Sequence, residues 1–264
     1  MSAWELVLDG SYDSRSNMAR DLAMFESVIS GSRSGVLRIY DWSEPAVTFG
    51  RHQKAFTPSD PSLHIPLLRR PTGGGAVLHV RDITFSLSVP CRGRFSRGIE
   101  DSCRTVTGIF ASALEHCGLA VEMKGDETGF SSICFRRSSP VELCIGGSKV
   151  LGLAALRKRG FMLFQGVVPL AVDATLSRRV FGMEGDPGLK GIHDYIPGFH
   201  VETFVSRLLD VFASQADLLF SHCSGEDGQD HHDNERKIHL RRQEPCHESL
   251  SEERIDHDRR QDAQ

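Results

Sequence analysis

Three consecutive glycines, at residues 73–75, follow Arg69 and Arg70 and precede a short apolar run. Because glycine has no Cβ, such a loop can adopt positive φ and let a ligand lie against bare backbone N–H groups. The two guanidinium groups are planar, permanently charged donors that suit a carboxylate, a phosphate or an acyl carbonyl. A glycine-rich turn is more often only a turn. Here the arginines and the strand-like segment 82–90 favour a binding loop for an acyl or phosphoryl group.

Lys149 is a second candidate for chemistry. It follows a Gly-Gly turn and begins an apolar strand, so its ammonium can face the same pocket as the glycine loop. A cation fixed there would polarise an acyl carbonyl as negative charge develops on its oxygen. A solvated turn lysine is the alternative interpretation.

Cys134 and His79 are the remaining candidates. Cys134 lies fifteen residues before Lys149, and an isolated free cysteine is most often a small buried side chain. Cys144 is a competing thiol, but its strand-like apolar surroundings favour a place in the core. His79 ends the glycine motif and is either a base that contacts substrate or a structural residue with satisfied hydrogen bonds.

The composition limits the domain organisation and the class of partner. Residues 222–264 contain twelve acidic and seven basic side chains with few apolar ones, so they cannot bury a core and are expected to be a disordered acidic tail. Residues 1–221 are then nearly neutral and are expected to form one domain. A neutral body lacks the concentrated basic face that nucleic-acid binding needs. The histidines at 231 and 232 lie in this polar tail, so no metal site is expected.

The cysteines and the chain start predict the compartment. Seven cysteines, an odd number, show no CxxC pair and no regular framework, which favours reduced thiols rather than a disulfide scaffold. The first residues lack the basic and apolar regions of a signal peptide, and no segment approaches about 20 uninterrupted apolar residues. A cytoplasmic protein without membrane association is therefore expected.

The apolar periodicity predicts an α+β fold. Helices are expected at residues 15–30, 99–117 and 201–219, and a connection at 192–197. Strands are expected at 37–40, 46–49, 76–79, 83–89, 121–123, 141–145, 149–154 and 161–168. The glycines at 146 and 147 predict a hairpin between two of these strands. This order of elements suits a sheet covered by helices on one side.

Several ordered motifs resemble one family. The segment RRPTGGGAVLH at 69–79 is followed by DITFS at 82–86, and LRIYDW at 37–42, PAVTFGRHQ at 45–53 and GSKVLGLA at 147–154 also match. Together they resemble the lipoate/biotin protein ligase catalytic superfamily. Within it they are most similar to lipoate-protein ligase A and the cysteine-dependent octanoyltransferases.

This resemblance implies the fold, the reaction and the site. The fold would be the biotin/lipoate protein ligase catalytic fold, related to class II aminoacyl-tRNA synthetases, with a mixed or antiparallel sheet. The reaction would move octanoyl from acyl carrier protein through a Cys134 thioester to a lysine of a lipoyl domain or glycine-cleavage H protein. No cofactor is implied. Cys134 and Lys149 would be catalytic, and the substrate-binding residues would be Arg69, Arg70, Thr72, Gly73, Gly74, Gly75, His79, Gly152 and Ala154.

Departures from the family pattern keep two alternatives open. Leu153, Gln165 and Val167 stand where the family usually has serine, histidine and serine, so a diverged acyl-binding homologue without activity is one alternative. The other is an ATP-dependent lipoate-protein ligase that needs Mg²⁺. For the octanoyltransferase, the donor and the acceptor would both be small acidic domains that dock on basic residues such as those at 157–159.

Overall fold

A computed structural model describes residues 4–124, 142–182, 190–216 and 220–223. The helices are α1 (Ser14–Ile29), α2 (Ile99–Glu115), α3 (Ala174–Phe181) and α4 (Val201–Ala216), with 3-10 turns η1 (Gly93–Phe95) and η3 (Ile192–Asp194). The strands are β1 (Trp4–Tyr12), β2 (Val36–Trp42), β3 (Ala46–Phe49), β4 (Leu67–Arg69), β5 (Val77–His79), β6 (Arg81–Pro90), β7 (Glu122–Lys124), β8 (Glu142–Ile145), β9 (Ser148–Lys158), β10 (Phe161–Ala171) and β11 (Phe220–Cys223). All of them belong to the first of two units into which the chain divides, residues 1–232.

The described strands form two sheets. The larger has the order β11-β1-β2-β6-β10-β9-β8-β7, and the smaller has the order β4-β3-β5. β1 pairs in parallel with both β2 and β11, whereas the larger sheet from β2 to β7 is antiparallel. The expected α+β fold with a mixed sheet is confirmed. The sequence interpretation did not include β1, β4, β11 or α3 as helices or strands.

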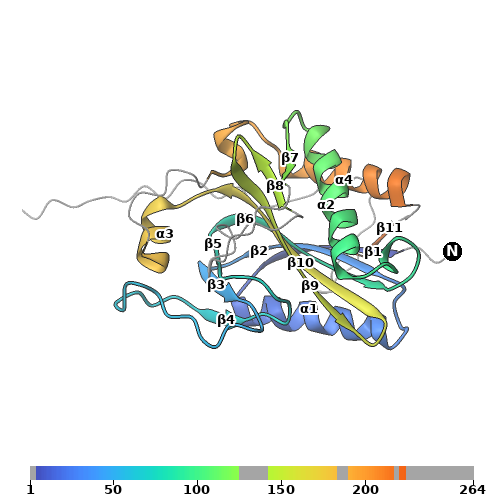
Figure 1. Cartoon of the computed structure of the whole chain (residues 1–264), viewed down its shortest axis with the longest axis horizontal. Helices are drawn as coiled ribbons and strands as arrows, with labels where there is room; N and C mark the ends of the chain where they lie inside the picture. The colour runs from blue at the N-terminus through green and yellow to red at the C-terminus, as the bar shows by residue number, and fades with distance from the viewer. Residues whose placement is uncertain (1–3, 125–141, 183–189, 217–219, 224–264) are drawn as a thin grey trace, which may run out of the picture. The chain divides into compact units, whose positions relative to one another are not determined.

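Helices cover both faces of the larger sheet, with α1 on one side and α2 and α4 on the other (Figure 1). Side chains along β6 alternate between the two layers, as the pleat requires. Phe85 stacks on Phe110 of α2, with ring centroids 4.1 Å apart. Ser86 points the other way and donates to Asp21 of α1 at 2.7 Å. The expectation of a sheet covered on one side was therefore wrong.

The layer between α1 and the large sheet is polar. Apolar periodicity in the sequence therefore predicted the helix but not this buried polar layer. The fully buried guanidinium of Arg38 on β2 donates to Asp9 (2.8 Å), Asp21 (2.7 Å) and the side chain of Asn17 (2.7 Å). A buried charge is tolerated only with such partners. Asp13 is the N-cap of α1, and its carboxylate accepts from two backbone N–H groups of the first turn.

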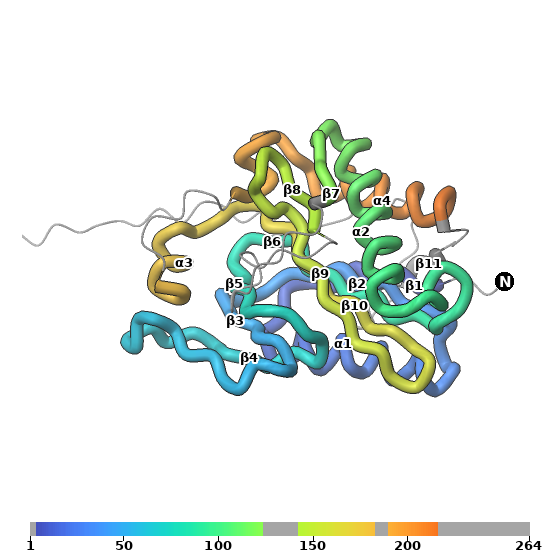
Figure 2. Tube along the Cα trace, viewed as in Figure 1, coloured from blue at the N-terminus to red at the C-terminus, as the bar shows by residue number. Residues whose placement is uncertain are grey.

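The β8–β9 hairpin follows the expected pattern. Gly146 and Gly147 have φ of 53° and 83°, which only glycine adopts easily. β9 then continues to Lys158, further than the sequence indicated, and pairs with β10 from Gly152 to Lys158 (Figure 2). Within the described ranges no helix has the length and apolar character needed to cross a bilayer.

Candidate active site

The glycine loop is held from inside by Arg70. This arginine is 5% exposed, and its guanidinium donates to the carbonyls of Gly73 (2.6 Å), Gly75 (2.7 Å) and Thr48 (3.1 Å). Gly74 has φ of 89°, and a Cβ on it would lie 2.7 Å from the Arg70 guanidinium. The sequence placed Arg70 among the substrate-binding residues. In the structure it fixes the shape of the loop and also lines the pocket beside it.

Arg69 has a different place. It is exposed, and it donates to the backbone carbonyls of Arg51 (3.2 Å), Gln53 and Lys54 (2.8 Å). Its guanidinium also lies over the ring of Phe49, 4.7 Å from the centroid. Arg69 thus orders the segment after β3 and faces the outside of the loop.

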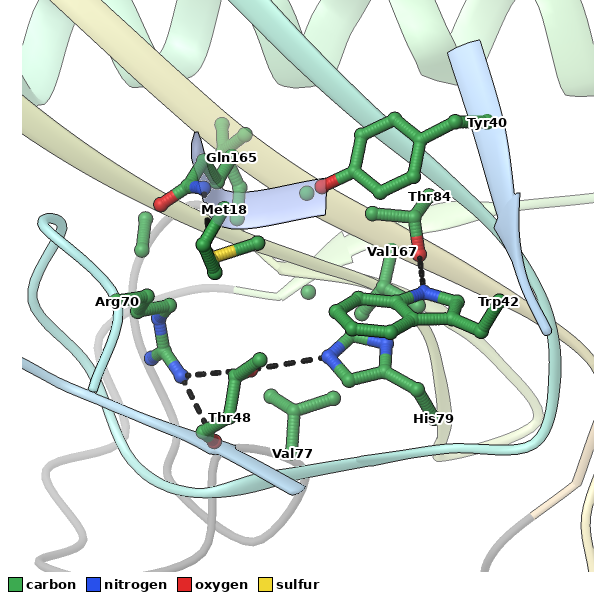
Figure 3. A pocket seen from close by; sticks show the side chains of 14 residues that line it. Met18, Tyr40, Trp42, Thr48, Arg70, Val77, His79, Thr84, Gln165 and Val167 are labelled. Carbon is green, nitrogen blue, oxygen red and sulfur yellow. Dashed lines mark hydrogen bonds between the residues drawn. The ribbon is translucent and has the colours of Figure 1, made fainter. Parts of the chain in front are cut away.

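A pocket opens next to the glycine loop, between the small sheet and the polar face of the large one (Figure 3). Six strands and α1 contribute to its walls. Its lining residues are Met18, Tyr40, Trp42, Thr48, Arg70, Val77, His79, Thr84, Gly152, Leu153, Ala154, Gln165, Gly166 and Val167. Apolar walls with a few converging polar groups are typical of a site for a small ligand or an acyl chain.

Thr72 and Gln165 connect the glycine loop to the buried polar layer. The hydroxyl of Thr72, fully buried, donates to Gln165 Oε1 at 2.8 Å, and Gln165 Nε2 donates to Asp21 Oδ2 at 2.7 Å. The same carboxylate accepts from Tyr40 at 2.9 Å. Burial and the neighbouring Asp21 charge raise the pKa of the Tyr40 phenol well above its ordinary value, so Tyr40 stays a donor. The departure at Gln165 therefore has a defined role as a bridge.

His79 lies in the pocket wall with both ring nitrogens bonded. Nδ1 lies 2.9 Å from Asp82 and Nε2 lies 2.9 Å from the hydroxyl of Thr48, while the ring stacks on Trp42 at 4.1 Å (Figure 3). These contacts join β3, β5 and β6. The sequence left His79 open between a base and a structural residue, and this geometry supports the structural role.

The predicted pair Gly152 and Ala154 on β9 lines the pocket, with Leu153 between them. On the adjacent strand β10, Gly166 also lines the pocket, and a Cβ there would lie 2.2 Å from the Phe85 ring. Position 166 therefore requires glycine. Sequence reasoning did not select Gly166, Tyr40, Trp42 or Thr48, although three of them lie within motifs that carried the family resemblance.

Lys149 is buried at the start of β9 but is not among the residues that line this pocket. Its Nζ lies 2.6 Å from Glu142 Oε1 on β8, and both side chains are 7% exposed. Glu142 was not selected from the sequence. An acid seven residues before a candidate lysine, across a glycine hairpin, is a signal that could have identified it.

Cys134, the predicted nucleophile, lies outside the described residues. Four cysteines are described with their side chains, at positions 91, 103, 117 and 144, and none of these four lines the pocket. Burial raises the pKa of Cys103 to about 11 and also raises that of Cys117. Cys144 is 2% exposed, which confirms its expected place in the core. Among the described side chains, no group of three or more His, Cys, Asp or Glu residues could hold a metal ion.

Comparison with known proteins decides the family. The family model described as the lipoyl protein ligase A/B catalytic domain matches residues 13–213. The chain belongs to this family.

Two curated members of the lipoyl protein ligase A/B family are named octanoyltransferase LipM. The protein from Carboxydothermus hydrogenoformans is 32% identical over 187 residues, which cover 68% of this chain and 70% of the relative. That from Exiguobacterium sp. is 31% identical over 197 residues, which cover 69% and 71%.

Solved structures confirm the lipoate protein ligase fold. A protein from T. acidophilum described as a putative lipoate protein ligase has a TM-score of 0.71 at 19% identity, covering 86% of this chain and 90% of the other. A lipoate-protein ligase A structure bound with ATP has a TM-score of 0.70 at 20% identity, with the same coverage. At these identities the likeness defines the fold alone.

Proposed function

We propose that this protein is an octanoyltransferase of protein lipoylation. The observation that carries the proposal is its similarity to the two octanoyltransferases across about 70% of their length. The pocket supports it, because Met18, Val77, Leu153 and Val167 provide apolar walls for an acyl chain beside the glycine loop. The site is thus suited to an enzyme that holds a fatty acyl group.

The reaction proceeds in two transfers. The Cys134 thiolate attacks the octanoyl thioester of acyl carrier protein, a new carbon–sulfur bond forms, and the carrier thiol leaves with a proton. The ε-amine of an acceptor lysine, on a lipoyl domain or a glycine-cleavage H protein, then attacks the enzyme thioester. An amide forms, Cys134 regains its thiol, and one proton is released from the original ammonium. Neither transfer requires a nucleotide or a metal.

The chain's own residues shape both steps. Arg70 holds the carbonyls of Gly73 and Gly75, which fixes the loop that borders the acyl chain. Lys149 does not line the pocket, and the role of the cation that polarises the reacting carbonyl is assigned to it on its motif alone; its pairing with Glu142 limits the positions of its ammonium. The cytoplasm, where thiols stay reduced, is the proposed compartment.

Intact-mass spectrometry tests this function. The purified protein is incubated with octanoyl-acyl carrier protein without ATP. The expected result is a gain of one octanoyl group that hydroxylamine removes. Cys134→Ser should lose the adduct, whereas Cys144→Ser, at a buried thiol of the core, serves as the matched control and should retain it.

Other outcomes would replace the proposal. If no adduct forms, but lipoate with Mg-ATP leads to modification of a lipoyl domain, the protein is an ATP-dependent ligase. If neither substrate system gives a product while octanoate still binds, the protein is a diverged acyl-binding homologue.

A further inference from the structure

A second hollow, a groove of about 510 Å³, lies beside residues 69–71, which precede the glycine loop. Three segments that are distant in sequence form it: α1, the region from the end of β3 to Pro71, and the end of β9. All three segments lie in the lower part of the view in Figure 2. A volume of this size is in the range of binding sites for extended small ligands.

The groove is cationic. Arg51, Arg69, Arg157 and Lys158 contribute to its lining, and no carboxylate is among the residues that line it in the described part of the chain. The bonds of Arg69 go to neutral carbonyls, so its charge is not compensated. Lys158 pairs with Glu26 at the edge.

Arg51 and Arg157 are the groups most available to a ligand. Both are exposed, and within the described ranges no carboxylate lies at ion-pair distance from either. The groove therefore presents two free guanidinium groups. Guanidinium groups bind phosphate oxygens in bidentate geometry, which distinguishes them from lysine ammonium groups.

Apolar side chains also line the groove. Leu22, at 40% exposure, and Leu156 lie among the cations. Met18 and Arg70 line both the groove and the pocket beside the glycine loop. A long ligand bound in the groove can therefore extend its end towards the acyl pocket.

The charge of the reacting group distinguishes the two macromolecular substrates, both of which are expected to be acidic domains. The acceptor presents a lysine, which is a cation in water and is repelled by a groove lined with cations. The donor presents its acyl group on a flexible arm that contains a phosphodiester anion and an uncharged chain. We propose that this groove binds the acylated phosphopantetheine arm of the carrier-bound donor, with the phosphate at Arg51 and Arg157. This inference rests on the proposed octanoyltransferase function.

The test uses charge reversal of the two free arginines together, Arg51→Glu with Arg157→Glu, in the full chain. The rate of enzyme-thioester formation is measured with octanoyl-carrier protein, octanoyl-coenzyme A and octanoyl-pantetheine, which lacks phosphate. Arg94→Glu in η1 is the matched control, because Arg94 is exposed and lines no part of the groove. Arg51→Ala with Arg157→Ala is a milder second variant if thermal unfolding shows that the reversal destabilises the fold.

The expected result is a selective loss. The second-order rate should fall about tenfold or more with the two phosphate-bearing donors and stay within about twofold with octanoyl-pantetheine. Raising the salt concentration should slow the wild type more with the two phosphate-bearing donors than with octanoyl-pantetheine. An equal loss with all three donors, or none, overturns the inference. A loss with carrier protein alone also overturns it, because the arginines would then contact the carrier surface rather than the arm. Failure of the proposed function itself is distinguishable, since the wild type would form no thioester with any donor.

Discussion

Lys149 Nζ lies 2.6 Å from Glu142 Oε1 across the β8–β9 hairpin, and each side chain is 7% exposed. The hairpin that brings them together is held at its end by Tyr195, whose hydroxyl donates to the Ile145 carbonyl at 3.0 Å. A buried ammonium needs such a partner, because removing it leaves a desolvated charge. Glu142 is therefore placed to position the lysine that the proposed mechanism uses.

Substitution of either member of this pair should slow transfer. Lys149→Ala should lower kcat by about 10²–10³, the usual cost of losing one group that stabilises developing charge. Glu142→Gln keeps the size of the side chain but misplaces the ammonium, and kcat should fall by up to about 100-fold with little change in KM.

A double variant shows whether Glu142 acts through Lys149. If it does, Glu142→Gln in the Lys149→Ala background should cause no further loss. Glu142→Asp should recover part of the activity. Glu122→Gln, at an exposed carboxylate on the neighbouring strand β7, is the control. If the losses in kcat from the two substitutions instead multiply in the double variant, and circular dichroism shows that the variants are folded, a positioning role for Glu142 is excluded.

The two adjacent glycines 73 and 74 should respond differently to alanine. Gly74→Ala places a Cβ 2.7 Å from the Arg70 guanidinium at φ of 89°, whereas a Cβ at Gly73 meets nothing within 4 Å. Strain at positive φ costs about 1–2 kcal/mol, and a displaced Arg70 distorts the loop further. Gly74→Ala should therefore lower both the free energy of unfolding and the transfer rate. Gly73→Ala should be close to wild type in urea unfolding, and equal losses in the two variants would contradict this account.

Gln165 should contribute to stability as well as to the site. Gln165→Leu leaves Thr72 and Asp21 each without one buried hydrogen bond. Each unsatisfied group costs about 1–3 kcal/mol, so the denaturant midpoint should fall clearly. Gln215→Leu is the control, since Gln215 is exposed and its bond to Ser112 lies at the surface. Equal midpoints for the two variants would show that the bridge contributes nothing.

Protonation of the Asp9 carboxylate should lower the stability of the fold at acid pH. Burial raises the pKa of Asp9, but hydrogen bonds and charge from Arg20 and Arg38 lower it more, so the folded pKa lies below the ordinary value. A lowered folded pKa gives stability that is present above the unfolded pKa, about 3.9, and is lost as pH falls through the folded value. Thermal midpoints measured from pH 6 to pH 2.5 should fall at the acid end. The thermal midpoint of Asp9→Asn should fall less over this pH range. A fall as steep as that of the wild type would contradict the role given to Asp9.

The amino-acid sequence determined the family, the α+β class and most of the elements. The helices at 15–30, 99–117 and 201–219 correspond to α1, α2 and α4 within a few residues, because their apolar positions repeat with helical spacing. The glycine loop was also readable, since the chemistry of glycine and arginine is local. The reaction that these motifs imply agrees with the names of the relatives.

Tertiary structure decided which groups meet. Asp21 and Gln165 are 144 residues apart, and Gln165 bridges Asp21 to Thr72 only because the small sheet folds over the polar face of the large one. Apolar periodicity does not predict the polar layer under α1, because buried polar groups carry no periodic signal. Such groups are stable only with partners from other strands. The ion pair of Lys149 and the groove at Arg51 and Arg157 likewise depend on side-chain contacts between segments, which spacing along one chain does not encode.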